Sequence, residues 1–276
     1  MKRELTSAEV AHFHNDGFLS IPKITTTAEI SQIRSLYDGL FERRAGWEKG
    51  DFFDFAGQDG PGKTESVPQL LEPSKYAPML KKTLFRSNAQ YIAKQLLGPD
   101  AELVFEHAMM KPPRTGGETP WHQDEAFFPK FTNYRSVTFW LPLQPVDAAN
   151  GCLDFIPGSH KGPLLPHQSI NNDPRIHGLE TLFADASRKV TCPLVEGGAT
   201  VHHYKTLHHA GPNTADGPRR AYALGFGVRS RAYTLRSDFS WNLEKATARN
   251  KRAEEAQGPV RRCLSQLKDS AKSVFR

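Results

Sequence analysis

His122 and Asp124 stand two residues apart in the stretch TPWHQDE, residues 119–125. Side chains alternate between the two faces of a β-strand, so an extended backbone here would point both residues to the same side. An imidazole and a carboxylate on one face can share a metal ion, and a second histidine would complete the two-histidine, one-carboxylate set that holds non-heme iron. A histidine and an aspartate in an exposed turn are the competing interpretation, so the rest of the chain must supply the third ligand.

The stretch LHHAGPN, residues 207–213, offers that second histidine. His208 and His209 are adjacent, and neighbouring residues of a strand face opposite ways, so only one of them can point inward. Arg219 follows eleven residues after His208, just past a DGP sequence that is typical of a turn. An arginine can hold a carboxylate through two parallel hydrogen bonds at constant charge, which indicates a site for an acidic ligand beside the metal.

The elements that would position these residues change character along the chain. The first third predicts helices, one between Thr6 and Gly17 with Glu9 completing a capping box, and others over residues 27–44 and 78–97. From residue 100 onward, short strand-like runs alternate with glycine and proline turns, over residues 103–110, 121–124, 136–143, 151–156, 190–195, 199–204 and 220–228. This order predicts a mainly β protein with flanking helices, a double-stranded β-helix (jelly roll) buttressed by its N-terminal part.

We expect one jelly-roll domain over residues 1–240, with its helical part in residues 1–99, and a basic, helical tail over residues 241–276. Residues 46–73 carry several aromatic side chains between glycines and prolines, which fits either a binding loop or a loop that packs on the core. Helices are expected over residues 243–256 and 260–274. Leu264, Leu267 and Val274 would dock the second of these on the barrel or on another subunit, which leaves a homodimer open.

Composition excludes several classes of function. The chain has 276 residues, 38% of them hydrophobic and 24% charged, as in an ordinary globular protein. Its net charge is +6, but the basic residues are scattered along the chain and no nucleic-acid-binding motif occurs. We therefore expect no nucleic-acid partner. We also expect no membrane partner, because no long apolar run occurs. Three widely spaced cysteines predict neither a disulfide framework nor a zinc site, and we expect a cytoplasmic protein.

Several motifs together resemble the phytanoyl-CoA dioxygenase family of Fe(II)- and 2-oxoglutarate-dependent oxygenases. They are HQD at residues 122–124, NGCL at 150–153, PGSHK at 157–161, and the stretch 208–213 followed by Arg219. The segments 13–22 and 111–113 are also similar to family segments. The resemblance extends over about residues 6–230 and does not include the tail.

The resemblance implies that His122, Asp124 and His208 bind iron and that Arg219 pairs with the carboxylate of 2-oxoglutarate. The family spacing to Arg219 favours His208 over His209. Two departures stand out. Ala210 replaces the serine or threonine that often follows the distal histidine, and residues 197–198 are Gly-Gly instead of Gly-Asp. The cosubstrate contacts beyond Arg219 are therefore open, and Lys111 and Met109 are our candidates from the neighbouring strand.

Aromatic residues near the metal motif are candidates for the substrate pocket. Phe127 and Phe128 follow the first ligands directly and are expected at the barrel mouth. Trp140 lies on a strand that should line the barrel, where core packing is favoured over a place in the pocket wall. No role is assigned to His107, His160, His202 and His203.

The resemblance implies an enzyme that uses Fe(II), 2-oxoglutarate and O2 to hydroxylate an aliphatic carbon of a small molecule, releasing succinate and CO2. Epimerisation, desaturation or ring formation from the same iron chemistry is an alternative. A metal-binding sensor without turnover is another, but a sensor would not need Arg219. No residue pattern selects the substrate.

Overall fold

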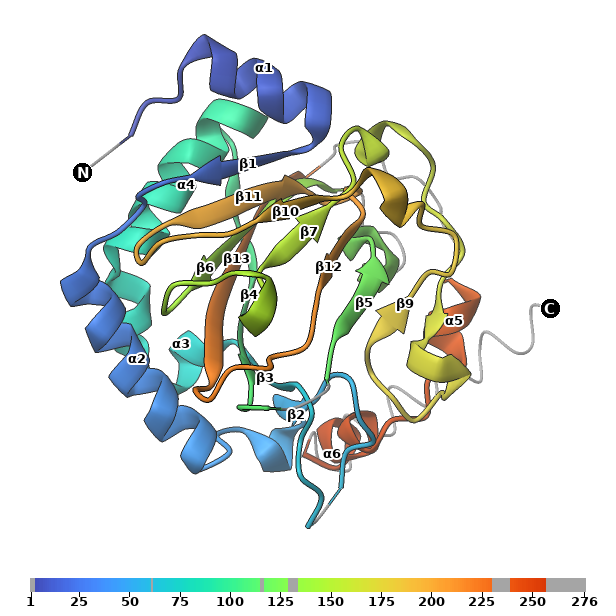
Figure 1. The fold of residues 1–276 in the computed structure, drawn as a ribbon. Helices are drawn as coiled ribbons and strands as arrows, with labels where there is room; N and C mark the ends of the chain where they lie inside the picture. Colours follow the sequence, from blue (N-terminus) through green and yellow to red (C-terminus); the bar gives the residue numbers. More distant parts are fainter. Residues whose placement is uncertain (1–2, 61, 115–116, 129–133, 230–238, 257–276) are drawn as a thin grey trace.

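The computed structural model of the chain describes residues 3–60, 62–114, 117–128, 134–229 and 239–256 (Figure 1). Two antiparallel sheets pack against one another and form a jelly roll, as the sequence predicted. The larger sheet has the order β1-β11-β6-β13-β4-β3-β2, and the smaller one β10-β7-β12-β5. A two-stranded sheet pairs β8 with β9.

The strands that carry the site are long in the large sheet and short in the small one. The large sheet contains β1 (Phe18–Ile21), β2 (Phe52–Asp54), β3 (Pro68–Leu71), β4 (Glu102–Lys111), β6 (Tyr134–Pro142), β11 (Ala199–His203) and β13 (Arg219–Arg229). The remaining strands are β5 (Thr119–His122), β7 (Leu153–Phe155), β8 (Gln168–Ser169), β9 (Leu179–Glu180), β10 (Val190–Cys192) and β12 (His208–Ala210).

The helices α2 and α4 cover the outer face of the large sheet. The α-helices are α1 (Ser7–Asp16), α2 (Thr27–Glu42), α3 (Pro73–Tyr76), α4 (Leu84–Leu97), α5 (Ser240–Leu243) and α6 (Ala248–Ala256). Apolar residues of α2 and α4 form one core with the outward residues of β6 and β13. The capping box of Thr6 and Glu9 is present, and Gly17 ends α1 in the left-handed conformation, as expected.

Short 3-10 turns connect these elements. They are η1 (Trp47–Lys49), η2 (Pro78–Lys82), η3 (Asp124–Phe127), η4 (Ala148–Asn150), η5 (Ser159–Lys161), η6 (Ile170–Asn172) and η7 (Ala186–Arg188). The third helix was predicted as one piece, but η2 and α4 divide it at Thr83, whose hydroxyl accepts from the Arg86 amide and so starts a new helix.

A second core lies between the two sheets and includes Trp140, Phe155, Ala221 and Ala223. Residues 46–73 form β2 and β3 in addition to loops, and they place Phe52 in the outer core and Phe53 in a third cluster. Packing on the core, one of the two interpretations of this segment, is therefore confirmed. The predicted helix over residues 260–274, with Leu264, Leu267 and Val274, lies outside the described residues. Within the described ranges, no helix has the length and apolar character needed to cross a lipid bilayer.

Candidate active site

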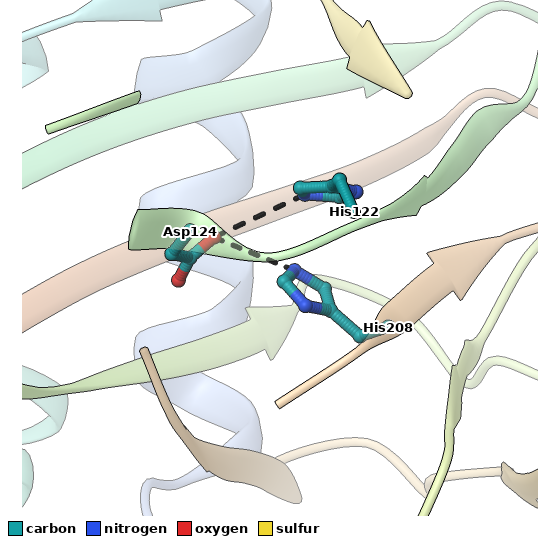
Figure 2. A group of neighbouring side chains, drawn as sticks. All are labelled: His122, Asp124 and His208. Atoms are coloured by element: carbon teal, nitrogen blue, oxygen red, sulfur yellow. Dashed lines mark ion pairs between the residues drawn. The ribbon is translucent and has the colours of Figure 1, made fainter. Parts of the chain in front are cut away.

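The register of two short strands brings the predicted metal ligands together. In the small sheet His208 of β12 pairs directly with His122 of β5. One ligand atom from each of His122, Asp124 and His208 lies within 4.8 Å of the others (Figure 2). Oδ1 of Asp124 is 3.5 Å from Nε2 of His208 and 3.9 Å from Nε2 of His122.

Asp124 reaches this group in a different way from the one predicted. β5 ends at His122, and Asp124 is the first residue of the 3-10 turn η3. Gln123 keeps an extended backbone, with φ −120° and ψ 133°, so the alternation of side chains continues for one more residue before the chain turns. His122 and Asp124 therefore share a side although they do not share a strand.

Backbone carbonyls orient both imidazoles. Nδ1 of His122 lies 2.7 Å from the carbonyl oxygen of Pro120, and Nδ1 of His208 lies 2.9 Å from that of Thr206. A ring that donates from Nδ1 presents the Nε2 lone pair, which is how metal-binding histidines are usually fixed. Burial lowers the pKa of His122 and lowers that of His208 further, which keeps both rings in the neutral form that binds a metal.

The second oxygen of Asp124 has its own partners. The hydroxyl of Thr138 on β6 donates to Oδ2 at 2.6 Å, and Nε2 of His202 on β11 lies 3.3 Å from the same oxygen. Burial alone would raise the pKa of Asp124, but His208, His202 and His122 outweigh it and lower the pKa. The carboxylate is thus held ionised, with Oδ1 facing the two histidines.

Arg219 is a buried guanidinium that faces the same cavity. Its side chain is 1% exposed, and its Nε and Nη1 atoms have no hydrogen-bond partner among the described residues. Burial lowers its pKa to about 9. An unpaired buried cation is costly, so this position fits an anionic ligand well. The buried, neutral imidazoles and the ionised carboxylate likewise fit a divalent iron.

Arg220, the next residue, faces outward and donates from Nε to Asp38 at 2.6 Å. His209 also turns away from the ligand group, and its Nδ1 lies 3.2 Å from Oδ2 of Asp154. Of Arg219 and Arg220, and of His208 and His209, the residue that faces the metal-ligand group is therefore the one that the sequence favoured, Arg219 and His208.

Lys111 contradicts the prediction of a cosubstrate contact. It pairs with Arg219 across β4 and β13, but it does not line the cavity. Its Nζ atom donates to the carbonyls of Gly117, Ala210 and Gly211 at 3.1, 2.8 and 2.6 Å. These three bonds use all the donors of the ammonium group, so Lys111 joins the two sheets at their edge instead of binding a ligand.

A cavity of about 440 Å³ connects the ligand group to a mostly apolar chamber. Met109, our candidate for a cosubstrate contact, lines it, and so do Phe127, Phe128 and Trp140, our candidates for the substrate pocket. The Trp140 ring lies 5.4 Å from the Arg219 guanidinium carbon, which places it beside the expected cosubstrate position.

The cavity also contains residues that the sequence did not identify. Gln69, Phe105, His107, Thr138, His177 and His202 line it. Phe53 and Phe55 also line it, and they belong to the aromatic segment 46–73 that the sequence offered as a possible binding loop. His202 and Thr138 sit opposite each other on β11 and β6. Their positions follow from the pairing of two strands that lie about 60 residues apart in the chain. The one sign of a functional role in the sequence was that each is a polar side chain at an inward position of an otherwise apolar strand.

The C-terminal helices contact the wall of this chamber. The Trp241 indole and the Asn242 amide, both on α5, each donate to the Ala126 carbonyl at 3.0 Å. The Lys245 ammonium lies 5.0 Å from the Phe127 ring centroid, and the Arg249 guanidinium carbon lies 4.8 Å from that of Phe53. Residues 241–249 therefore support the pocket wall.

Comparison with known proteins gives consistent matches. A family model described as Phytanoyl-CoA dioxygenase (PhyH) matches residues 13–221. The peroxisomal phytanoyl-CoA dioxygenase of Rattus norvegicus is 26% identical over 239 residues, 78% of this chain. A probable alpha-ketoglutarate-dependent hypophosphite dioxygenase of Stutzerimonas stutzeri is 32% identical over 174 residues, 60% of this chain. The two matches span 66% and 59% of those relatives.

Among solved structures, EvdO2 from Micromonospora carbonacea var. aurantiaca in complex with 2-oxoglutarate has a TM-score of 0.72 and 33% identity. The superposition includes 87% of this chain and 99% of that protein. The similarity therefore extends over most of this chain.

Proposed function

This chain belongs to the phytanoyl-CoA dioxygenase family, and from that premise we propose that it is an Fe(II)- and 2-oxoglutarate-dependent dioxygenase. It hydroxylates an aliphatic carbon of a small-molecule substrate and releases succinate and CO2. The observation that carries this proposal is the buried, unpaired guanidinium of Arg219 in the cavity that also holds the His122, Asp124 and His208 group.

His122, Asp124 and His208 would hold the iron from one side. Bound there, iron would supply the oxidising chemistry that uses a keto acid and dioxygen. The chain's own residues prepare the site. Thr138 and the backbone carbonyls fix the orientation of the ligand side chains before any ligand arrives, so little reorganisation is needed on binding.

Arg219 would anchor the distal carboxylate of 2-oxoglutarate. Its planar fork can pair with two carboxylate oxygens, and burial strengthens each bond. Ala210 offers no hydroxyl to assist, so the anchor depends on Arg219 more than it would with a serine there. Trp140 lies beside the guanidinium and carries a buried indole Nε1 that has no hydrogen-bond partner among the described residues. It is therefore a second candidate contact to the cosubstrate.

The apolar wall of the chamber excludes water from the reaction. Phe55 and Phe127 lie beside His122, and Phe128 also lines the cavity. Exclusion of water prevents side reactions of reactive intermediates. Hydroxylation and the alternatives of epimerisation, desaturation and ring formation need this same arrangement, and the substrate decides between them.

A sensor without turnover remains the alternative from another class of function, and it does not account for Arg219. We propose a small-molecule substrate and no nucleic-acid or membrane partner. We also propose a cytoplasmic location, with which the free thiols of Cys152 and Cys192 are consistent.

The test is formation of succinate from 2-oxoglutarate in the presence of Fe(II) and ascorbate. We expect slow uncoupled turnover without a substrate and a keto-acid charge-transfer band when iron and 2-oxoglutarate are added without oxygen. If the protein gives neither signal, the oxygenase proposal is wrong.

A further inference from the structure

A polar pair, Gln69 and His107, faces the cavity away from the metal ligands and Arg219. Both residues line the cavity, and Gln69 is only 5% exposed. Nδ1 of His107 lies 3.3 Å from Oε1 of Gln69. Neither side chain is needed for iron or for the carboxylate of 2-oxoglutarate.

The strand register locates this pair on the substrate side. Arg219 pairs with Lys111 and Ala223 pairs with His107, so four residues, about 13 Å, separate the anchor from His107 along the sheet. β13 also separates β4, which carries His107, from β6, which carries Thr138. Two strand spacings amount to about 10 Å, so a substrate can lie between Asp124 and His107.

The floor between these positions is formed by small residues. Ala223 pairs with both His107 and Trp140, and it presents only a methyl group to the cavity. Gly225 is the next inward residue of β13, and a Cβ there would lie 2.0 Å from the Phe105 ring. The missing side chain lets Phe105 lie flat across the strand as a wall of the chamber.

The chemistry of His107 selects a hydrogen-bond donor. Because Oε1 of Gln69 can only accept, Nδ1 of His107 carries the proton and Nε2 keeps a lone pair. Within the described residues, Nε2 makes no hydrogen bond. Burial is the main cause that lowers the pKa of His107 to about 4, so the ring stays neutral near pH 7. A ligand hydroxyl can donate to this nitrogen, whereas an ether or a ketone cannot.

The aromatic walls of the chamber favour a substrate with a flat, apolar ring system. Five phenylalanine rings line the chamber, and they are Phe53, Phe55, Phe105, Phe127 and Phe128. Rings gain from stacked or edge-on contact with one another, beyond the area that they bury. The cavity of about 440 Å³ must also hold 2-oxoglutarate, so the enclosed part of the substrate is small.

We propose that this half of the cavity binds an aromatic or fused-ring alcohol, whose hydroxyl donates to Nε2 of His107 while Gln69 fixes the imidazole. The inference rests on the proposed function, because it assigns the substrate class of the same site. His107 is a specificity-determining residue and not a metal ligand.

The test compares three probes by equilibrium dialysis under argon against the full chain loaded with Fe(II) and 2-oxoglutarate. The probes are 2-naphthol, 2-methoxynaphthalene and naphthalene, which share one ring system and differ in the O–H donor. We expect 2-naphthol to bind about five- to tenfold more tightly than the other two, the value of one buried hydrogen bond. Without such a bond, the desolvation of the hydroxyl would favour naphthalene.

Two variants test whether the preference for 2-naphthol over naphthalene depends on His107 and Gln69. His107→Phe keeps a ring but removes the acceptor, and we expect equal affinities for 2-naphthol and naphthalene. Gln69→Leu removes the partner of Nδ1, and we expect the preference to fall to about twofold because the ring can turn or change tautomer. The matched control is His12→Phe on the exposed side of α1, which should keep the full preference. Melting curves check that each variant is folded.

Two outcomes overturn the inference: wild-type protein that shows no preference for 2-naphthol, including no binding of any probe, or a preference that persists in both His107→Phe and Gln69→Leu. Either outcome can occur while the charge-transfer band and succinate formation are normal, and then only the substrate class is wrong. Loss of those two signals would instead contradict the oxygenase itself, since probe binding requires no turnover.

Discussion

The two halves of the cavity are built by different kinds of structure. In the metal half, His122, His208 and Arg219 lie on strands, and Thr138 and His202 approach from two more strands. In the substrate half, Gln69, Phe105 and His107 also lie on strands, but Phe55 and His177 come from loops and Phe127 from a 3-10 turn, and the helices after residue 239 support them.

This difference indicates that the sequence of the substrate half can change without altering the geometry of the metal half. Backbone hydrogen bonds between strands fix the metal half, so its geometry follows from the register of the sheets. Loops and turns that pack against the strands by their side chains complete the substrate half, and such segments tolerate changes of sequence. The family match ends at residue 221, before the helices that support the substrate half. Changes in one half should therefore leave the other half measurably intact.

Replacing Asp124 by alanine should break the metal half completely. The loss of an ionised ligand should reduce iron-dependent turnover of 2-oxoglutarate by more than the 10- to 100-fold that loss of an outer partner typically causes. Iron content after dialysis and succinate formation measure the effect. Asp173→Ala, which removes a carboxylate paired with Arg175 outside the cavity, is the control. Turnover that survives in Asp124→Ala would exclude this residue as a ligand.

Replacing Arg219 by alanine should raise the 2-oxoglutarate concentration for half-maximal turnover about 10- to 100-fold, because a charged pair of hydrogen bonds is lost. Binding of the naphthalene probes should not change. Arg220→Ala is the matched control, since Arg220 faces outward to Asp38. An unaltered 2-oxoglutarate requirement in Arg219→Ala would place the anchor elsewhere.

Replacing Thr138 by valine should lower iron affinity about tenfold and leave probe binding unchanged. The hydroxyl that donates to Asp124 is removed while the shape is kept, and outer partners of metal ligands typically have effects of this size. Metal titration followed by the charge-transfer band measures it. Thr138→Ser should restore the affinity, and if serine is as weak as valine the hydroxyl is not responsible.

Replacing Trp241 by phenylalanine should affect the substrate half alone. The indole bond to the Ala126 carbonyl is lost, and we expect about twofold weaker binding of both 2-naphthol and naphthalene. The 2-oxoglutarate requirement should stay constant. A change in that requirement, with probe binding intact, would show that the C-terminal helices act on the metal half.

The preference for 2-naphthol should be the same at about pH 6 and pH 8. Burial lowers the pKa of His107 to about 4, so the ring remains an acceptor across this interval. An ordinary histidine, with a pKa near 6.5, would gain a proton at the lower pH and lose its acceptor. Dialysis at the two pH values measures the ratio, and a fall at pH 6 would mean that His107 is not held neutral.

Much of the fold was predictable because local signals coincide with the final structure. The capping box of Thr6 and Glu9 and the glycine after α1 specify a helix by themselves. Alternating apolar residues specified β6 and β13, since each has one face on the outer core and one in the interior. The break at Thr83 was missed because the apolar pattern continues across it while the backbone does not.

The sequence by itself determined which residues could form the metal half: a histidine and an aspartate two residues apart, a distant histidine and an arginine. Their types carry the chemistry, and their spacing suits strands. Only the tertiary structure decided that Lys111 binds carbonyls, that His202 and Thr138 approach Asp124, and that Gln69 meets His107. These contacts join residues far apart in the chain, and strand register and loop packing, which no local pattern encodes, set them.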